Sequence, residues 1–194
     1  GKRKSRERVK IIVGLGNAKI GYWNTRHNVG FKAIDLLRKK YTPSKVIKHQ
    51  HYRGWETEIA GSPVILIKPK TFMNESGIAV KKAFERFYGK LDDYIIIHDE
   101  LDVPLGKIKI TAGKGPGGHK GVLSVVNELG SKDFIRIRIG IWKENLDAPY
   151  VDYVLSPFLP EERPLVEESL ERMVSAIEEI VKSGIQKAMS IYNT

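Results

Sequence analysis

The sequence predicts an α/β protein of one domain, because short apolar runs alternate with segments of helical periodicity. Strands are expected at 9–15, 46–47, 55–59, 64–67, 94–98, 107–111 and 134–141. Some of these segments are almost wholly apolar, as buried strands are, and others alternate between apolar and polar residues. Between them, apolar residues recur at helical spacing, at 28–40, 79–88, 119–129 and 161–183. A length of 194 residues suits one domain with a sizeable core, and no repeat or linker divides it.

The composition excludes several kinds of protein. With no cysteine, the chain has neither a disulfide framework nor a thiolate nucleophile, which suits the cytoplasm. It contains no run of 18 apolar residues, so we expect no membrane span. The apolar run Ile11–Val13 is far too short for a signal peptide. We therefore expect a cytoplasmic protein that does not bind a membrane.

The charge is positive and unevenly distributed. The formal net charge is +10, yet residues 161–180 hold seven glutamates against two arginines. The rest of the chain is therefore strongly basic, which favours a polyanionic partner such as nucleic acid. Residues 1–10 hold six basic side chains and one glutamate. We expect residues 1–8 to be a disordered basic arm or a cloning remnant, and residues 9–194 to form the domain.

The first strand leads into the loop that carries the strongest candidate for chemistry. Gly14 and Gly16 let the backbone turn sharply, and the next helix begins at Asn28, which we expect to cap it. His27 therefore lies on a loop near the carboxyl end of the strand, the edge where open α/β sheets place their sites. Its position favours general base catalysis and a structural role about equally.

Two further loops end at similar positions. Residues 68–77 connect a strand to a helix, and the side chain of Asn74 is expected either to cap that helix or to bind a ligand. Asp99 directly follows the strand at 94–98 and is the first of three acids in four residues. These acids could bind a divalent cation, but without a glycine-containing calcium loop they are more typical of charged strand ends.

A metal site is not expected from the histidines either. His49 and His51 lie two residues apart, which on a strand places both on one face. A metal would need further ligands, and the surrounding sequence offers none. We therefore interpret both as surface residues and expect no metal.

Basic residues indicate where a phosphate would bind. The glycine-rich loop at 113–121 opens a helix whose N–H groups could hold a phosphate, although it lacks P-loop spacing. Along 134–141, alternate arginines share one strand face, which suits either phosphate contact or a solvated surface. The expected phosphate contacts are Lys109, Lys114, Arg136 and Arg138. The polar loop at 143–157 is long enough to act as a cover or a binding element.

Four motifs in this chain carry a family resemblance. They are Thr25-Arg26-His27-Asn28, Lys68-Pro69-Lys70-Thr71-Phe72-Met73-Asn74, His98-Asp99-Glu100-Leu101-Asp102 and Gly117-Gly118-His119-Lys120-Gly121. With these motifs in this order, the chain resembles bacterial-type peptidyl-tRNA hydrolases from Val9 to the C-terminus. The resemblance implies a single α/β domain with a twisted mixed sheet flanked by helices.

The resemblance also implies an activity and a set of site residues. It implies an esterase that cleaves the peptide from the 3′ end of tRNA and so recycles tRNA from stalled translation. His27 would be the general base that activates water, and Asp99 would orient it. Asn17 and Asn74 would hold the peptide backbone, and Asn74 would also donate to the oxyanion. The remaining substrate-binding residues implied are Tyr22, Phe72 and Lys120. We expect tRNA as the partner, no cofactor, and a monomer.

The chain departs from the family pattern at several positions. Ala18-Lys19 stands where the family has Pro-Gly, and Trp142 where it has glycine. Lys120 replaces the asparagine of a Gly-His-Asn-Gly motif, which is thought to hold substrate or water. That role therefore does not transfer directly to Lys120.

Two other functions compete with this interpretation. Ile11-Ile12-Val13-Gly14-Leu15-Gly16 resembles the start of a dinucleotide-binding fingerprint, but the third glycine would fall at Lys19. The other alternative is a binding protein that keeps the fold and has lost the reaction. Retention of His27 and Asp99 argues for activity, whereas Lys120 argues weakly against it.

Overall fold

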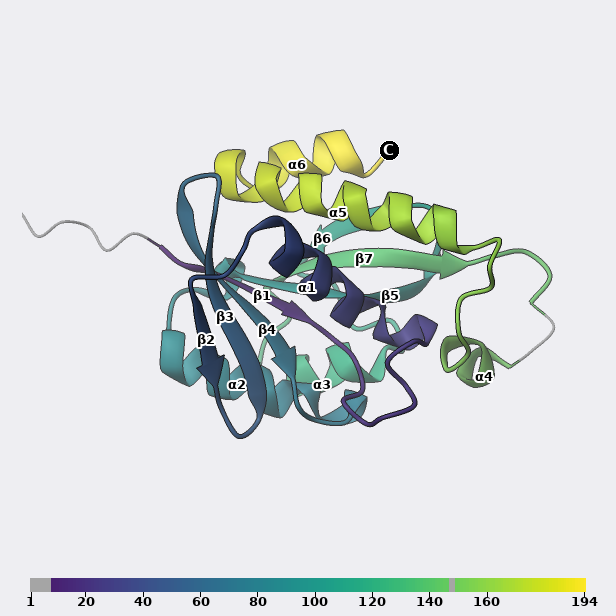
Figure 1. Ribbon diagram of the computed structural model, residues 1–194, viewed down its shortest axis with the longest axis horizontal. Coiled ribbons are helices and arrows are strands. Elements are labelled where there is room, and N and C mark those ends of the chain that lie inside the picture. Colours follow the sequence, from purple (N-terminus) through teal and green to yellow (C-terminus); the bar gives the residue numbers. More distant parts are fainter. Residues whose placement is uncertain (1–7, 147–148) are drawn as a thin grey trace, which may run out of the picture.

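The computed structural model describes residues 8–146 and 149–194, which form a seven-stranded mixed sheet flanked by helices (Figure 1). The strands are β1 (Lys10–Gly14), β2 (Lys45–Lys48), β3 (Tyr52–Ile59), β4 (Ser62–Pro69), β5 (Tyr94–Pro104), β6 (Ile108–Ala112) and β7 (Ile135–Trp142). Their order across the sheet is β2-β3-β4-β1-β5-β7-β6. The four strands β4, β1, β5 and β7 are parallel, whereas β3 and β6 run antiparallel to their neighbours. The predicted α/β fold class is confirmed.

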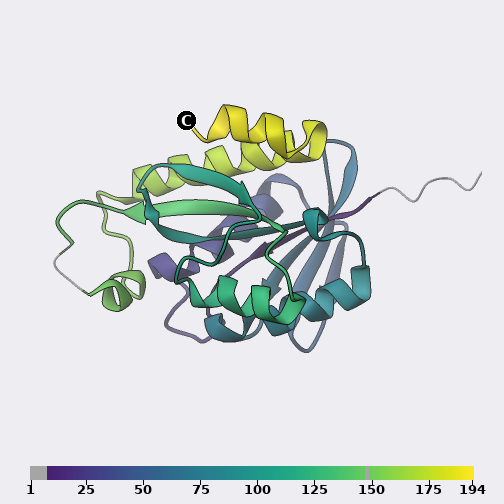
Figure 2. The same cartoon turned by 180° about the vertical axis from the view of Figure 1, so that it is seen from behind.

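Helices cover both faces of this sheet. They are α1 (Val29–Lys40), α2 (Ser76–Phe87), α3 (Lys120–Leu129), α4 (Tyr150–Val154), α5 (Arg163–Ser183) and α6 (Ile185–Tyr192), with 3-10 turns η1 (Arg26–Asn28), η2 (Met73–Glu75) and η3 (Leu91–Asp93). Helices α1, α5 and α6 lie on one face, and α2 and α3 on the other (Figures 1 and 2). Within the described ranges, no helix is both long and apolar enough to cross a membrane.

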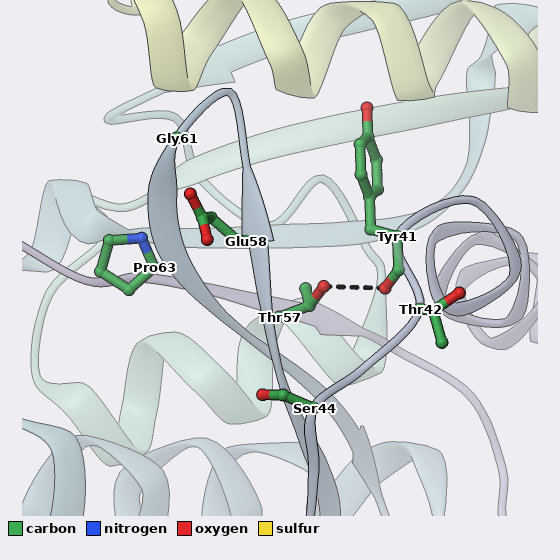
Figure 3. A pocket seen from close by; sticks show the side chains of 7 residues that line it. All are labelled: Tyr41, Thr42, Ser44, Thr57, Glu58, Gly61 and Pro63. Atoms are coloured by element: carbon green, nitrogen blue, oxygen red, sulfur yellow. Dashed lines mark hydrogen bonds between the residues drawn. The ribbon is translucent and has the colours of Figure 1, made fainter.

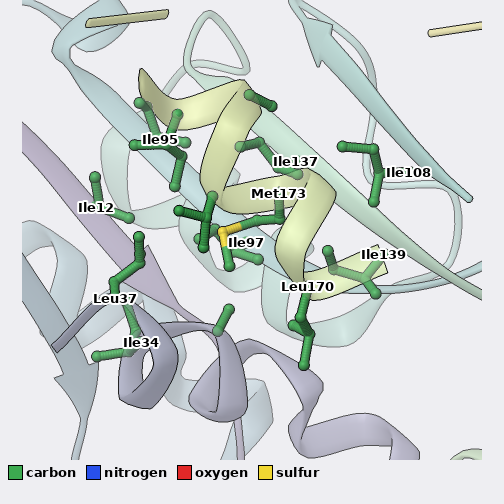
Figure 4. Close-up of a cluster of buried hydrophobic side chains, with 14 of the residues drawn as sticks. Ile12, Ile34, Leu37, Ile95, Ile97, Ile108, Ile137, Ile139, Leu170 and Met173 are labelled. Atoms are coloured by element: carbon green, nitrogen blue, oxygen red, sulfur yellow. The ribbon is translucent and has the colours of Figure 1, made fainter. Parts of the chain in front are cut away.

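Each layer of helices has its own core, because side chains alternate between the two faces of a strand. In β1, Ile12 belongs to the cluster beneath α1 and α5, whereas Ile11 and Val13 belong to the cluster beneath α2 and α3. Figure 4 shows the first cluster, where Leu170 and Met173 of α5 meet isoleucines of the sheet. Burial on both faces thus fixes the central strands, and with them the loops at their ends.

Helix α1 approaches the sheet closely. A Cβ atom on Gly30, in the first turn of α1, would lie 2.4 Å from the carbonyl oxygen of Leu15 and 2.6 Å from that of Ile97. A Cβ atom on Gly14 would lie 2.0 Å from the carbonyl oxygen of Gly30. The start of α1, and the loop before it, are therefore held directly against the ends of β1 and β5.

Substitution Gly30→Ala should destabilise the protein by about 3 kcal/mol, because backbone carbonyls cannot move aside for the new methyl group. This cost exceeds the ~1 kcal/mol that alanine gains over glycine inside a helix. Gly115→Ala is the matched control, since nothing lies within 4 Å of a Cβ atom at Gly115. Denaturant unfolding of both variants measures the effect; equal stability of Gly30→Ala and wild type would contradict the close approach.

The fold differs from the sequence prediction in three places. Strand β5 continues to Pro104, so Asp99 lies inside the strand rather than at its end. The segment 143–157 is not loop throughout, because Tyr150–Val154 forms α4. Arg8, placed by prediction in the basic arm, contacts Asp92 and Asp93 at 2.9 Å. The rest of the predicted arm, 1–7, lies outside the described residues.

Candidate active site

The polar residues singled out in the sequence converge at one edge of the sheet. The loops after β1 and β4 leave the sheet at the carboxyl ends of parallel neighbours, and the backbone N–H of Ala18 donates to the carbonyl of Thr71 at 3.2 Å. The N–H of Leu15 donates to the carbonyl of Ile97 on β5 at 2.9 Å. The parallel order thus gathers side chains from separate motifs, as expected for an open α/β sheet.

At this edge, one carboxylate joins two imidazoles. Nδ1 of His27 lies 2.8 Å from Oδ2 of Asp99, and Nε2 of His119 lies 2.8 Å from Oδ1 of the same carboxylate. The centroids of the two imidazole rings are 5.1 Å apart. Asp99 is 3% exposed, so its carboxylate is shielded from water and depends on these two partners. Sequence analysis did not assign a role to His119, although the residue lies in a quoted motif.

The backbone around His119 fixes which of its nitrogens carries the proton. Nδ1 of His119 accepts hydrogen bonds from the N–H groups of Gly121 and Val122, at 3.1 and 3.2 Å, and so caps helix α3. Its Nε2 must then carry the proton that is donated to Asp99. The other carboxylate oxygen accepts from Nδ1–H of His27. This leaves Nε2 of neutral His27 as a free lone pair, the state required of a general base.

The capping of α3 by His119 also changes the interpretation of the glycine-rich loop, which the sequence predicts to bind a phosphate. The N–H groups expected to hold a phosphate at the start of α3 are instead bound to the imidazole of His119. The N–H of Leu123 also donates within the protein, to the carbonyl of His119 at 2.9 Å. The glycine-rich loop therefore positions a histidine rather than cradling a phosphate through these groups.

The pKa values of the pair suit proton transfer. Burial lowers the pKa of His27, but the charge of Asp99 and its hydrogen bond more than offset this, so the pKa rises above its ordinary 6.5. The ammonium group of Lys120 acts in the opposite direction. Burial raises the pKa of Asp99, yet interactions with His119 and His27 hold it far below its usual range. Asp99 is therefore ionised at any working pH and stabilises an imidazolium on His27.

His27, Asp99 and His119 could also be considered as metal ligands, because their ligand atoms lie within 4.8 Å of one another. Both carboxylate oxygens and the nitrogens facing them are already joined by hydrogen bonds. The second nitrogen of His119 accepts from the backbone. A cation would have to displace these protons, so the arrangement suits proton transfer better than metal binding.

The predicted phosphate contact at Arg136 does not fit the position of this side chain. It is buried, its Nη2 donates to the carbonyl of Gly115 at 2.9 Å, and its Nη1 contacts Nε2 of His98 at 3.3 Å. Burial, together with the charge of Arg136, holds the pKa of His98 well below its ordinary value, so His98 accepts this hydrogen bond. The alternating pattern could not reveal that the glycine-rich loop covers Arg136.

The other three predicted phosphate contacts lie nearer the surface. Nε of Arg138 donates to Glu100 at 2.6 Å, and both side chains are largely buried, so its charge is partly neutralised. Lys109 pairs with Arg138 across β6 and β7 and is exposed, as is Lys114. The two lysines thus remain available to a polyanion, whereas Arg138 is engaged within the protein.

Asn28 holds the loop after β1 instead of capping α1. Its Oδ1 accepts from the backbone N–H of Asn17 at 2.8 Å, and its Nδ2 donates to the carbonyl of Asn17 at 2.9 Å. Its side chain makes no capping hydrogen bond to α1. This two-point clamp fixes the backbone of Asn17, whose own Oδ1 accepts from the N–H of Lys19 at 3.0 Å.

The remaining predicted substrate-binding residues lie on the loops around this edge. Asn74 is exposed within η2, and no side-chain hydrogen bond caps α2, so its predicted capping role is not found. Phe72 is 52% exposed just before it. Tyr22 is half-buried in the loop after β1, and Lys120 is exposed at the start of α3.

Arg26 is a further residue that the sequence did not single out. It is buried beside His27, and its Nη2 donates to Glu162 at 2.6 Å while its Nη1 donates to the carbonyl of Tyr153 at 3.0 Å. Its guanidinium also lies 4.0 Å from the centroid of the Tyr153 ring. Arg26 thus ties the turn that carries His27 to the segment around α4. Because Arg26 and Glu162 lie 136 residues apart, no local sequence pattern indicates that they pair.

A pocket of about 530 Å³ lies at the opposite edge of the sheet, near the turn between β3 and β4 (Figure 3). It is lined by Tyr41, Thr42, Ser44, Thr57, Glu58, Gly61 and Pro63. The hydroxyl of Thr57 donates to the carbonyl of Tyr41 at 2.7 Å. None of the histidines faces it, so it offers no comparable base.

Comparison with known proteins gives a consistent result. A family model described as peptidyl-tRNA hydrolase matches residues 11–194. A peptidyl-tRNA hydrolase of Thermodesulfovibrio yellowstonii is 47% identical over 189 residues, covering 94% of this chain and 98% of that protein. One from Syntrophomonas wolfei is 41% identical, covering 95% and 100%. The crystal structure of peptidyl-tRNA hydrolase from Acinetobacter baumannii has a TM-score of 0.88 at 31% identity, covering 96% and 95%.

Proposed function

Because the chain belongs to the peptidyl-tRNA hydrolase family, we propose that it cleaves peptidyl-tRNA with His27 as the general base and Asp99 as its partner. The observation that carries the mechanism is the hydrogen-bonded cluster of His27, Asp99 and His119, which supports a neutral His27 with a lone pair on Nε2. The reaction is hydrolysis of the ester between the peptide and the 3′ end of tRNA, which returns tRNA to translation.

The proton moves through one imidazole. Nε2 of His27 takes a proton from water as the water oxygen attacks the ester carbonyl carbon, and the ionised Asp99 stabilises the resulting imidazolium. The carbonyl oxygen becomes an oxyanion, to which the amide of Asn74 donates. The C–O bond to the ribose then breaks, and the imidazolium returns its proton to the departing oxygen. The products are free tRNA and a peptide carboxylic acid.

The enzyme selects a peptidyl group by forming hydrogen bonds with its first amide. The side-chain amides of Asn17 and Asn74 both donate and accept, as a peptide backbone requires. Tyr22 and Phe72 supply apolar contact from the loops on which these asparagines lie. On the RNA side, we assign phosphate contacts to Lys109 and Lys114, with Arg138 contributing through its residual donors.

We place the enzyme in the cytoplasm, where ribosomes produce its substrate, and propose that it works as a monomer without a metal. Water is the nucleophile, and an ester to a ribose oxygen is activated enough for imidazole catalysis alone. Activity that persists after treatment with chelator, in material that elutes as a monomer, supports this. Activity restored only by added metal would contradict it.

Hydrolysis of N-acetyl-aminoacyl-tRNA tests the proposed function directly. We expect release of the N-acetyl amino acid, and much slower release from the same aminoacyl-tRNA without the acetyl group. Binding of tRNA without release would instead support the alternative, a protein that keeps the fold and has lost the reaction. Equal rates on both substrates would contradict the assigned amide recognition.

Lys120→Asn should weaken substrate binding while keeping kcat within about threefold. The side chain of Lys120 is exposed at the start of α3, and an ammonium on a long stem suits a phosphate near the 3′ end of tRNA better than the reacting centre. Removing this charge should also move the acid limb of the pH profile slightly upward, because the ammonium lowers the pKa of His27. Lys120→Arg keeps the charge and should keep KM. A large change in kcat with unaltered KM would refute this outward orientation.

A further inference from the structure

The loop between Asn17 and His27 presents a tryptophan to solvent. Trp23 is 72% exposed on a turn held by three hydrogen bonds around Tyr22. The N–H of Tyr22 donates to Lys19, and the carbonyl of Tyr22 accepts from both N–H and Oγ1 of Thr25, at 3.0 and 2.7 Å. The indole is thus displayed by a fixed turn.

Lys32 places a positive charge beside this turn. Nζ of Lys32, on α1, donates to Oδ1 of Asn24 at 3.1 Å and lies 5.3 Å from the ring centroid of Phe158. Burial, and then the charge of Arg163 at the start of α5, lower the pKa of Lys32. Within residues 8–146 and 149–194, neither Lys32 nor Arg163 has a carboxylate within 4.0 Å. The two positive charges therefore repel each other, and in the described part of the chain no carboxylate pairs with either.

We propose that Trp23, Asn24, Lys32 and Arg163 form a nucleotide subsite for the unpaired 3′ end of tRNA, an inference that rests on the proposed function. A base stacks on the indole of Trp23, and its phosphate binds the ammonium of Lys32, with the charge of Arg163 adding to the attraction. Aromatic side chains bind single-stranded bases in this way, and a charged donor beside the ring suits the phosphate of the same nucleotide. The ammonium of Lys32 has three N–H groups, of which Asn24 uses one.

The position of the subsite favours RNA over the peptide. Trp23 lies four residues before His27, so their Cα atoms are at most about 14 Å apart, within reach of the last few nucleotides. A peptide has a variable sequence and no regular negative charge, so a positive charge held at Lys32 would not select it. An anion at Lys32 offsets its repulsion by Arg163, and RNA carries such an anion at every nucleotide.

The test for stacking uses deacylated tRNA, labelled at its 5′ end, in fluorescence anisotropy. Trp23→Ala should raise Kd about tenfold, and Trp23→Phe should restore most of the affinity. Trp142→Ala is the matched control, because Trp142 is also exposed, at 40%, but lies at the end of β7. It should leave Kd unchanged. Equal affinities for Trp23→Ala and wild type would overturn the proposal, as would a KM defect that depends on the attached peptide rather than on the tRNA.

The test for the phosphate uses the salt dependence of the same binding. Lys32→Gln should lower the slope of log Kd against log salt by about 0.7–0.9, the value for one lost phosphate contact. Lys39→Gln, an exposed lysine at the other end of α1, should leave the slope unchanged. An unaltered slope for Lys32→Gln would overturn the phosphate assignment. Because these readouts are binding constants, a wild-type protein that binds tRNA but fails to hydrolyse the ester would contradict the proposed function and leave the subsite intact.

Discussion

His27→Ala should lower kcat for N-acetyl-aminoacyl-tRNA by about 10²–10⁴-fold, the usual contribution of a general base. In the proposed mechanism this imidazole is the group that accepts the proton of the attacking water. His119, the other imidazole on Asp99, cannot replace it, because its Nδ1 caps α3 and its Nε2 proton is held by the carboxylate. Single-turnover hydrolysis at saturating enzyme measures the loss.

Two controls separate loss of the base from loss of the fold. The affinity of His27→Ala for deacylated tRNA should stay close to that of wild type, since the imidazole is not a phosphate ligand. His49→Ala removes a histidine at the turn between β2 and β3, which is not part of the His27–Asp99–His119 cluster, and should keep full activity. A hydrolysis rate of His27→Ala within tenfold of wild type would contradict the mechanism.

Asp99→Asn should be at least as damaging, because it disturbs the tautomer of His27 as well as the stabilisation of its imidazolium. The tautomer of His119 is fixed by α3, so the amide oxygen of the new asparagine is needed to accept from Nε2–H of His119. The amide NH₂ then faces Nδ1 of His27 and favours the tautomer that carries its proton on Nε2. That tautomer has no lone pair for water, and an analogous change in a protease triad costs on the order of 10⁴-fold.

The pH dependence of this variant has a definite sign. In wild type the carboxylate raises the pKa of His27, so activity falls with decreasing pH from above 6.5. Removing the negative charge should move the acid limb of the residual activity to lower pH. Asp102→Asn, an exposed acid on the same strand, should change neither rate nor profile. An Asp99→Asn enzyme with the wild-type rate and profile would remove Asp99 from the mechanism.

Much of the fold could be predicted because local patterns were strong. The runs around Ile12 and Ile96 are apolar on both faces, as strands between two helical layers must be. The strand-to-loop positions of His27 and Asn74 followed from the same periodicity. The extension of β5 through Asp99 could not be predicted in this way. A run of acidic residues is typical of the end of a strand, and the partners of these residues lie on other elements.

The parts of the site that escaped prediction depend on distant contacts. His119 reads as part of a glycine-rich loop, and its role depends on Asp99, 20 residues away. Arg136 follows the pattern of an exposed strand face, yet the loop containing Gly115 covers it. Asn28 has the sequence position of a helix cap, but the backbone of Asn17 offers its amide two hydrogen bonds instead of one. In each case a tertiary partner outcompeted the local preference.

The most direct test of the central claim is to titrate the His27 imidazole by ¹⁵N NMR in the free enzyme and compare it with the pH dependence of kcat/KM. The acid limb of kcat/KM reports the pKa of the essential base in the free enzyme. We predict that both measurements give one pKa, above 6.5, and that neutral His27 carries its proton on Nδ1. A kinetic pKa that differs from that of His27, or a neutral imidazole protonated on Nε2, would contradict the assignment of His27 as the general base.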